Sequence, residues 1–230
     1  MQKPPEYGYP VKSPKLDRIL TVAVMVVAAM IILFPLFVRE KSTVRDAGCA
    51  NNLRQIGQAM KLYSADYDDR FPAGIDPSDK FIPAMWSAQP KRAAVIKKLP
   101  LLQDILKRYV KTPGVFRCPL DTGGELMDVA NQPFHTAPSM FANYGTSYIF
   151  RTEIVFKSMV QKDYWPPQYI GMLYDGYGHW HGNVDPVTPA TGEAKTGYLV
   201  KKFRYNALFG DLHVEMLGND EYQATWRRQL

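Results

Sequence analysis

The chain has 230 residues, of which 46% are hydrophobic and 22% are charged, and its mean hydropathy is −0.25. These values exclude a wholly disordered chain, a collagen-like repeat and a protein that crosses a membrane several times. The net charge is +6, but residues 39–230 hold 24 of the 28 basic and 20 of the 22 acidic side chains, with no basic run and no zinc-finger spacing. This diffuse charge predicts that nucleic acid is not a partner.

The first predicted element is an apolar helix over residues 19–38. These positions carry no charged side chain, and Thr21 is their one polar side chain. Twenty helical residues span about 30 Å, which is the thickness of the hydrocarbon layer of a bilayer. A buried core helix would keep a polar stripe, and a cleaved signal peptide would be shorter and end in small residues. The sequence therefore predicts a single transmembrane helix, with membrane lipid as a partner.

Basic residues near the two ends of this helix indicate its orientation. By the positive-inside rule, an excess of basic side chains before the helix places the N-terminus in the cytoplasm. Residues 1–18 are therefore predicted to be cytoplasmic, and the part after the helix extracytoplasmic. Four basic residues precede the helix (Lys3, Lys12, Lys15, Arg18) and three follow it (Arg39, Lys41, Arg45).

An amphipathic helix is predicted to continue the apolar one over residues 39–70. Its apolar side chains recur at steps of three and four, and the positions between them are polar. The hydrophobic face needs a partner, which residues 71–230 must supply. The apolar positions are Leu53, Ile56, Met60, Tyr63 and Tyr67.

Residues 71–230 are predicted to form a globular α+β domain that ends in a hairpin. Residues 204–209 and 212–217 flank Gly210-Asp211, a two-residue connection typical of a tight hairpin. Alternation predicts that Leu212, Val214 and Met216 are buried and that His213 is exposed. The predicted fold class is α+β, with a long N-terminal transmembrane and amphipathic helix packed on a small antiparallel C-terminal sheet.

Several segments along residues 16–217 together form a specific pattern: Leu33-Phe34-Pro35-Leu36-Phe37, Arg39-Glu40-Lys41, residues 49–60, residues 63–72, residues 115–121, Thr146-Ser147-Tyr148 and residues 206–214. In this pattern the chain resembles type IV pilins and type II secretion pseudopilins, in particular a bacterial prepilin-type group abundant in planctomycetes. The resemblance implies a pilin-like fold in the bacterial inner (cytoplasmic) membrane and assembly with other pilin-like subunits or secretion-machinery proteins.

The prepilin cleavage signal departs from the family pattern. Aligned through Leu33-Phe34-Pro35, Ser13 and Pro14 stand where prepilins carry the glycine and the phenylalanine of the cleavage site, and Arg18 replaces the family's glutamate. Proline after the cut site removes an amide hydrogen and stiffens the chain. We therefore expect an uncleaved chain, and mass spectrometry that finds a chain starting at Pro14 would refute this.

The C-terminal signature of the family is also incomplete. Lys201 stands in place of its histidine and Leu212 in place of its glycine, so that Asp211 and His213 are what remains. Asp211 beside His213 suggests a role in acid–base catalysis, but an aspartate in a tight hairpin more commonly has a structural role in the turn.

Cys49 and Cys118 each lie in a segment that carries the resemblance. With a cytoplasmic N-terminus, both lie where thiols are oxidised. A disulfide between them would link the long helix to residues 116–119 and stabilise the fold by about 2–5 kcal/mol. Two separate buried thiols are the alternative.

Two other groups of residues are candidates for a metal site. His179 and His181 would share one face of a strand and could bind one metal ion there, whereas a packed or solvated loop is the more common outcome. The acidic cluster of Asp66, Asp68 and Asp69 lacks the spacing of a calcium loop. No metal ligand set is assigned.

The motifs of serine hydrolases, of phosphate- and dinucleotide-binding loops and of zinc proteases are absent from the sequence. A non-enzymatic protein without a cofactor is therefore expected, namely a membrane-anchored pilin- or pseudopilin-like structural protein. The alternative is a membrane-anchored extracytoplasmic domain that binds carbohydrate or metal, and a metal-dependent hydrolase ranks third. The alternative would use residues 179–181 and an aromatic surface of Trp165, Tyr169, Tyr174 and Tyr177, side chains that more commonly pack in a small core.

Overall fold

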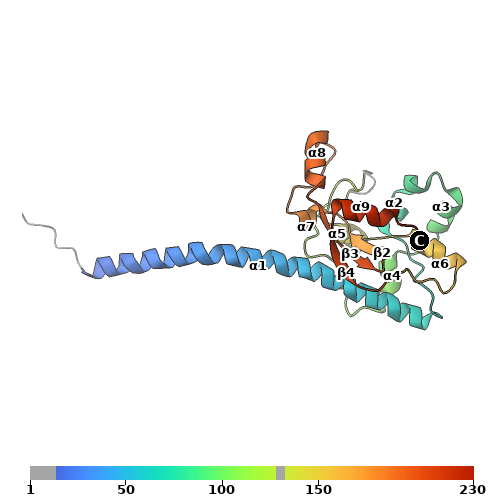
Figure 1. Ribbon diagram of the computed structural model, residues 1–230, viewed down its shortest axis with the longest axis horizontal. Coiled ribbons are helices and arrows are strands. Elements are labelled where there is room, and N and C mark those ends of the chain that lie inside the picture. The colour runs from blue at the N-terminus through green and yellow to red at the C-terminus, as the bar shows by residue number, and fades with distance from the viewer. Residues whose placement is uncertain (1–13, 128–132) are drawn as a thin grey trace, which may run out of the picture. The chain divides into compact units, whose positions relative to one another are not determined.

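The computed structural model describes residues 14–127 and 133–230 (Figure 1). The predicted cytoplasmic residues up to Ser13 lie outside these described residues, as does the Ser13 side of the cleavage position. The chain divides into two compact units, Met1–Val44 and Arg45–Leu230. Helix α1, Pro14–Asp66, contributes to both units.

The other elements all belong to the second unit. The strands are β1 (Tyr148–Phe150), β2 (Gly171–Asp175), β3 (Arg204–Phe209) and β4 (Val214–Gly218). The helices are α2 (Pro77–Phe81), α3 (Pro90–Ile96), α4 (Leu102–Leu106), α5 (Met140–Tyr144), α6 (Glu153–Val160), α7 (His179–Gly182), α8 (Glu193–Val200) and α9 (Asn219–Arg227), with 3-10 turns η1 (Pro83–Trp86) and η2 (Pro113–Phe116).

The predicted transmembrane helix over residues 19–38 is wrong. Within the described parts of the chain, no helix has both the length and the apolar character that a bilayer crossing requires. The same finding contradicts two further predictions, the single-pass location in the inner membrane and the transmembrane part of the fold class.

The predicted small antiparallel sheet is present. Its four strands lie in the order β1-β2-β3-β4, so each strand pairs with its neighbours in sequence. All three pairings are antiparallel, and Tyr174 lies opposite Ile149 on one side and Ala207 on the other. What remains of the predicted fold class is therefore a mixed helix and sheet protein.

The connection between β3 and β4 is longer than predicted. Leu208 pairs with Val214, so residues 210–213 form the turn, and the backbone N–H of Phe209 donates to the carbonyl of His213 at 3.0 Å. Leu212 and Val214 are partly buried against the cluster on the α1 side of the sheet and His213 is exposed, as alternation predicts, but the last two positions differ because the α9 side of the sheet is covered as well. Leu217 is buried, whereas Met216 is 44% exposed.

One face of the sheet is covered by the C-terminal part of α1. Leu53, Ile56 and Met60 are fully buried, as their spacing predicts, in one cluster with side chains of the sheet. Gly57 lets the helix approach closely, because a Cβ there would lie 3.1 Å from the methyl groups of Leu208 in β3. The predicted apolar face ends before Tyr67, which is 47% exposed.

The other face of the sheet is covered by α9, so that the strands lie between α9 and the C-terminal part of α1 (Figure 1). The ring of Tyr205 stacks on that of Tyr222 with centroids 3.7 Å apart, and the Tyr174 hydroxyl donates to Thr225 Oγ1 at 2.9 Å. The guanidinium of Arg151 donates to three carbonyls at the end of this helix, those of Thr225, Trp226 and Arg228. A sheet covered on both faces explains why every residue of β2 is buried.

The helix-to-sheet contact can be tested with one substitution at two positions of α1. Leu53→Ala removes a fully buried side chain and should lower the free energy of unfolding by about 3 kcal/mol. Leu62→Ala removes a side chain that is 55% exposed and should change that free energy by less than about 0.5 kcal/mol. Urea denaturation of both variants measures the difference, and equal losses would contradict the packing described above.

Candidate functional site

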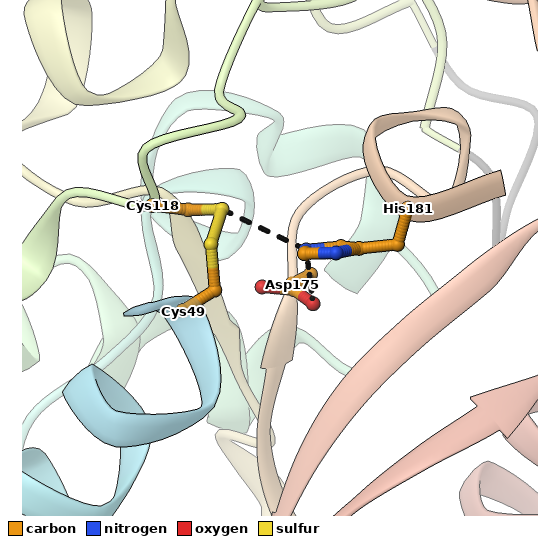
Figure 2. A group of neighbouring side chains, drawn as sticks. All are labelled: Cys49, Cys118, Asp175 and His181. Atoms are coloured by element: carbon orange, nitrogen blue, oxygen red, sulfur yellow. Dashed lines mark hydrogen bonds and ion pairs between the residues drawn. A yellow bond between two sulfur atoms is a disulfide. The ribbon is translucent and has the colours of Figure 1, made fainter. Parts of the chain in front are cut away.

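Four side chains from three separate parts of the sequence meet at the end of β2 (Figure 2). Cys49 comes from α1, Cys118 from the loop after η2, Asp175 from the last position of β2 and His181 from α7. The sulfur, nitrogen and oxygen atoms that they present all lie within 4.8 Å of one another. We call these four residues the cysteine–aspartate–histidine cluster.

Cys49 and Cys118 form a disulfide, as the sequence predicts. Both residues are fully buried, and their Cα atoms are 4.8 Å apart. Two hydrogen bonds support the link: Asn52 Nδ2 donates to the Arg117 carbonyl at 2.8 Å, and the Tyr148 hydroxyl donates to the Cys49 carbonyl at 3.4 Å. Helix α1 is thereby joined to the loop after η2 and to β1.

Asp175 is a fully buried carboxylate with unequal oxygens. Its Oδ2 accepts hydrogen bonds from the backbone nitrogen and from Nδ2 of Asn206, at 2.6 and 2.9 Å, and lies 3.0 Å from His181 Nε2. Its Oδ1 has no hydrogen-bond partner among the described residues. A buried carboxylate oxygen without a donor is costly, and such an exception calls for an explanation in terms of function.

One ring nitrogen of His181, Nε2, faces both the disulfide and the carboxylate of Asp175. Its Nε2 lies 3.7 Å from Cys118 Sγ and 3.0 Å from Asp175 Oδ2, and its side chain is fully buried. Gly178, the residue before α7, packs tightly against Phe203, which precedes β3, and against Tyr205 in β3. This close contact positions α7. A Cβ at Gly178 would lie 2.5 Å from atoms of Phe203 and Tyr205, so a larger residue does not fit there.

His179 and His181 do not form the two-histidine metal site that a strand would give. Both lie in α7, where side chains two residues apart point to different sides. His179 packs beside Thr122, whose Oγ1 lies 3.4 Å from its Nε2. Burial lowers the pKa of His179 to about 4, so this imidazole is neutral at pH 7.

The other predicted polar groups lie on the surface. Asp211 and His213 are exposed neighbours in the β3–β4 turn, and His213 stacks on Phe209 with ring centroids 4.5 Å apart. The hydrogen bond from His213 lowers the pKa of Asp211. The acidic cluster at the C-terminal end of α1 is also exposed, and its Asp66 accepts a hydrogen bond from Tyr109 at 3.0 Å. These contacts are those of turn and helix-end residues.

The predicted aromatic surface is not assembled. Tyr174 and Tyr177 are buried in the core, whereas Tyr169 is 55% exposed. Trp165 is partly buried, and its Nε1 donates to the Gly210 carbonyl at 2.6 Å. The ammonium of Lys61 lies 3.4 Å above the centre of the Trp165 ring. Tyr174 and Tyr177 therefore serve core packing, the alternative to a binding surface, and Tyr169 is the one of the four that is exposed.

Sequence reasoning missed a pair of buried carboxylates, Asp76 and Asp79. They line a cavity of about 190 Å³ together with Trp86, which donates to Asp79 Oδ1 at 2.7 Å. Burial, together with the charge of Asp79, raises the pKa of Asp76 to about 8. Burial also raises the pKa of Asp79 to about 6. The available signal was the aspartate before Pro77, a common way to begin a helix.

Comparison of this chain with protein-family models, with curated proteins and with solved structures finds no match. The candidate site therefore stands on its own geometry.

The disulfide should be present in the purified protein and should stabilise it. Closing a loop between residues 69 positions apart is worth about 4 kcal/mol in the chain-entropy estimate. A thiol assay on the denatured chain without reductant should find no free thiol, and reduction should lower the urea midpoint. Two reactive thiols per chain in the unreduced sample would contradict the disulfide.

The buried carboxylates should make the protein less stable as the pH rises. An aspartate whose folded-state pKa is raised keeps its proton in the folded chain after the unfolded chain has lost it. The stabilisation is therefore complete below about pH 4 and is lost as the pH rises through about 6 and then about 8, the folded-state values of Asp79 and Asp76.

Asp76→Asn should flatten this pH dependence, because the amide stays neutral throughout. Asp104→Asn, which changes an exposed carboxylate on α4, should leave it as it is in the parent. Urea midpoints measured from pH 4 to pH 9 make the comparison. A parent protein whose midpoint rises over that interval would show that the two carboxylates are ionised when folded.

Proposed function

We propose that this chain is a non-enzymatic structural subunit of the pilin and pseudopilin type. It would act by assembling with other pilin-like subunits or with a type II secretion or type IV pilus-like machine. The observation that carries the proposal is the difference in burial between the two parts of α1. Its C-terminal part supplies core residues to the second unit, whereas the apolar side chains described in its N-terminal part are exposed.

The exposed apolar side chains favour a role in association. Between Ile19 and Phe34, the exposed fractions of the large hydrophobic side chains run from 49% at Leu33 to 71% at Phe34. Isolated exposed apolar residues are common, but a contiguous apolar surface is typical of an interaction site. Packing between subunits would bury these side chains and would supply the hydrophobic free energy of assembly.

The construction of the second unit agrees with the same proposal. A long helix packed across an antiparallel sheet is the arrangement that the resemblance to pilins implies, and the motifs that carry the resemblance contribute to it. Residues 49–60 supply the buried face of the helix, residues 115–121 hold the second cysteine, and residues 206–214 include most of β3 and the β3–β4 turn.

Charged substitutions on the exposed helix test the proposal. Val24 and Ile31 are seven residues apart, so their side chains lie on the same face of α1. The double variant Val24→Asp with Ile31→Asp should weaken self-association, or co-purification with a pilin-like partner, by at least tenfold, which is about 1.4 kcal/mol. Sedimentation velocity and cross-linking of the full chain measure the effect.

Val160→Asp is the matched control, because Val160 in α6 is 88% exposed and lies outside α1. This variant should associate as the parent does. A parent chain that stays monomeric and retains no partner would overturn the proposal, and so would equal association of the double variant and the parent.

A further inference from the structure

The cysteine–aspartate–histidine cluster has the composition of a metal site as well as that of a disulfide. We propose that Cys49, Cys118, Asp175 and His181 bind one zinc ion when the disulfide is reduced. The same four residues would then join α1, the loop after η2, β2 and α7 in two alternative ways, by a sulfur–sulfur bond or by a four-ligand metal ion. This inference is independent of the proposed role in assembly.

The spacing of the donor atoms suits a tetrahedral ion. Ligand atoms at about 2.0 to 2.3 Å from one zinc ion lie about 3.3 to 3.8 Å from one another. Cys118 Sγ lies 3.7 Å from His181 Nε2, and His181 Nε2 lies 3.0 Å from Asp175 Oδ2. All of the donor atoms fall within 4.8 Å of one another (Figure 2), so small side-chain movements bring them to one centre.

The buried carboxylate is the observation that points to a ligand beyond the disulfide. Asp175 is fully buried, and its Oδ1 has no donor among the described residues. In Figure 2 this carboxylate lies between the disulfide and His181. A divalent cation would neutralise its charge and occupy the position where a donor is missing. A disulfide alone needs neither an aspartate nor a histidine beside it.

Asn206 supplies the outer support that metal ligands usually have. Its backbone nitrogen and its Nδ2 both donate to Asp175 Oδ2, and its Nδ2 also lies 3.3 Å from His181 Nε2. Such hydrogen bonds fix the orientation of a ligating carboxylate. Asn206 lies in β3, so the support comes from the rigid part of the sheet.

The donor set selects zinc rather than a hard cation. Two thiolates, one imidazole and one carboxylate are typical of zinc, whereas calcium and magnesium prefer oxygen ligands alone. Four protein ligands leave no open position, so the ion would be structural, and the buried cluster gives it no water to activate.

The exchange between the two states balances in electrons and protons. A dithiol reductant gives two electrons and two protons to the sulfur–sulfur bond, which breaks to two thiols while the reductant becomes a disulfide. Zinc then displaces the two thiol protons to solvent. His181 binds through Nε2 and carries its proton on Nδ1.

Cobalt(II) is the probe that tests this site, because tetrahedral Co²⁺ with thiolate ligands has strong visible bands and a thiolate-to-metal charge-transfer band. The full chain is reduced with a phosphine, freed of reductant under nitrogen and titrated with Co²⁺ and then with Zn²⁺. We expect one equivalent of Co²⁺ with both spectral features, displacement by one equivalent of Zn²⁺, and protection of both thiols from alkylation. The unreduced chain should show none of these.

Paired variants separate a metal site from two neighbouring thiols. His181→Gln should weaken Co²⁺ binding at least about 100-fold, because it removes a ligand, where loss of an outer partner alone costs 10- to 100-fold. His213→Gln, which makes the same change on the surface, should bind as the parent does. Asp175→Asn and the exposed Asp185→Asn form a second pair with the same expectation.

The proposal is overturned if the reduced parent takes up no Co²⁺, if the bound ion lacks the charge-transfer band, or if His181→Gln binds as tightly as the parent. Circular dichroism of each reduced variant accompanies the titration. A reduced parent that unfolds and is not refolded by Zn²⁺ also overturns it, because the ion is then unable to replace the disulfide.

Discussion

The packing of α1 on the sheet is the contact on which the rest of the second unit depends. Four short strands expose two apolar faces and are not stable without cover. One face is closed by Leu53, Ile56 and Met60, with Gly57 setting the close approach, and the other by α9. Because the α1 contact brings Cys49 to Cys118, and the sheet brings Asp175 to Asn206, the candidate site is a product of the same contact. Loss of the α1 face would therefore open the core and the site together.

Local patterns predicted the elements better than they predicted their environment. The three- and four-residue spacing of Leu53, Ile56 and Met60 identified a buried helix face, because periodicity within one helix directly reflects which side is covered. The apolar residues 19–38 suggested a membrane span by composition, and no described helix meets that requirement. The β3–β4 turn shows a related weakness. Alternation correctly made His213 exposed, but it assumes that one face of the hairpin is covered; with helices on both faces, Leu217 is buried on the α9 side whereas Met216 is 44% exposed.

Of the four residues of the candidate site, the two cysteines could be predicted to pair from the sequence, and the other two could not be placed beside them. Cys49 and Cys118 could be paired because cysteines are few and chemically selective, whereas Asp175 and His181 joined them through contacts between segments more than fifty residues apart. Sequence reasoning did single out residues 179–181, but for a strand geometry in which both histidines act together. The helix α7 sends the two imidazoles to different neighbours instead. Asp76 and Asp79 were missed because burial of a carboxylate has no local signature.

The position of the disulfide along the chain has a consequence for backbone cleavage. The bond closes a loop from Cys49 to Cys118 that contains the C-terminal end of α1 and the whole of α2, η1, α3, α4 and η2. A protease that cuts once at an exposed turn inside this loop, such as the one at Asp68 and Asp69, would produce two fragments that remain covalently attached. The fragments would separate on a gel after reduction and would run together before it. Nicked molecules would thus keep both halves of the core in one covalent body.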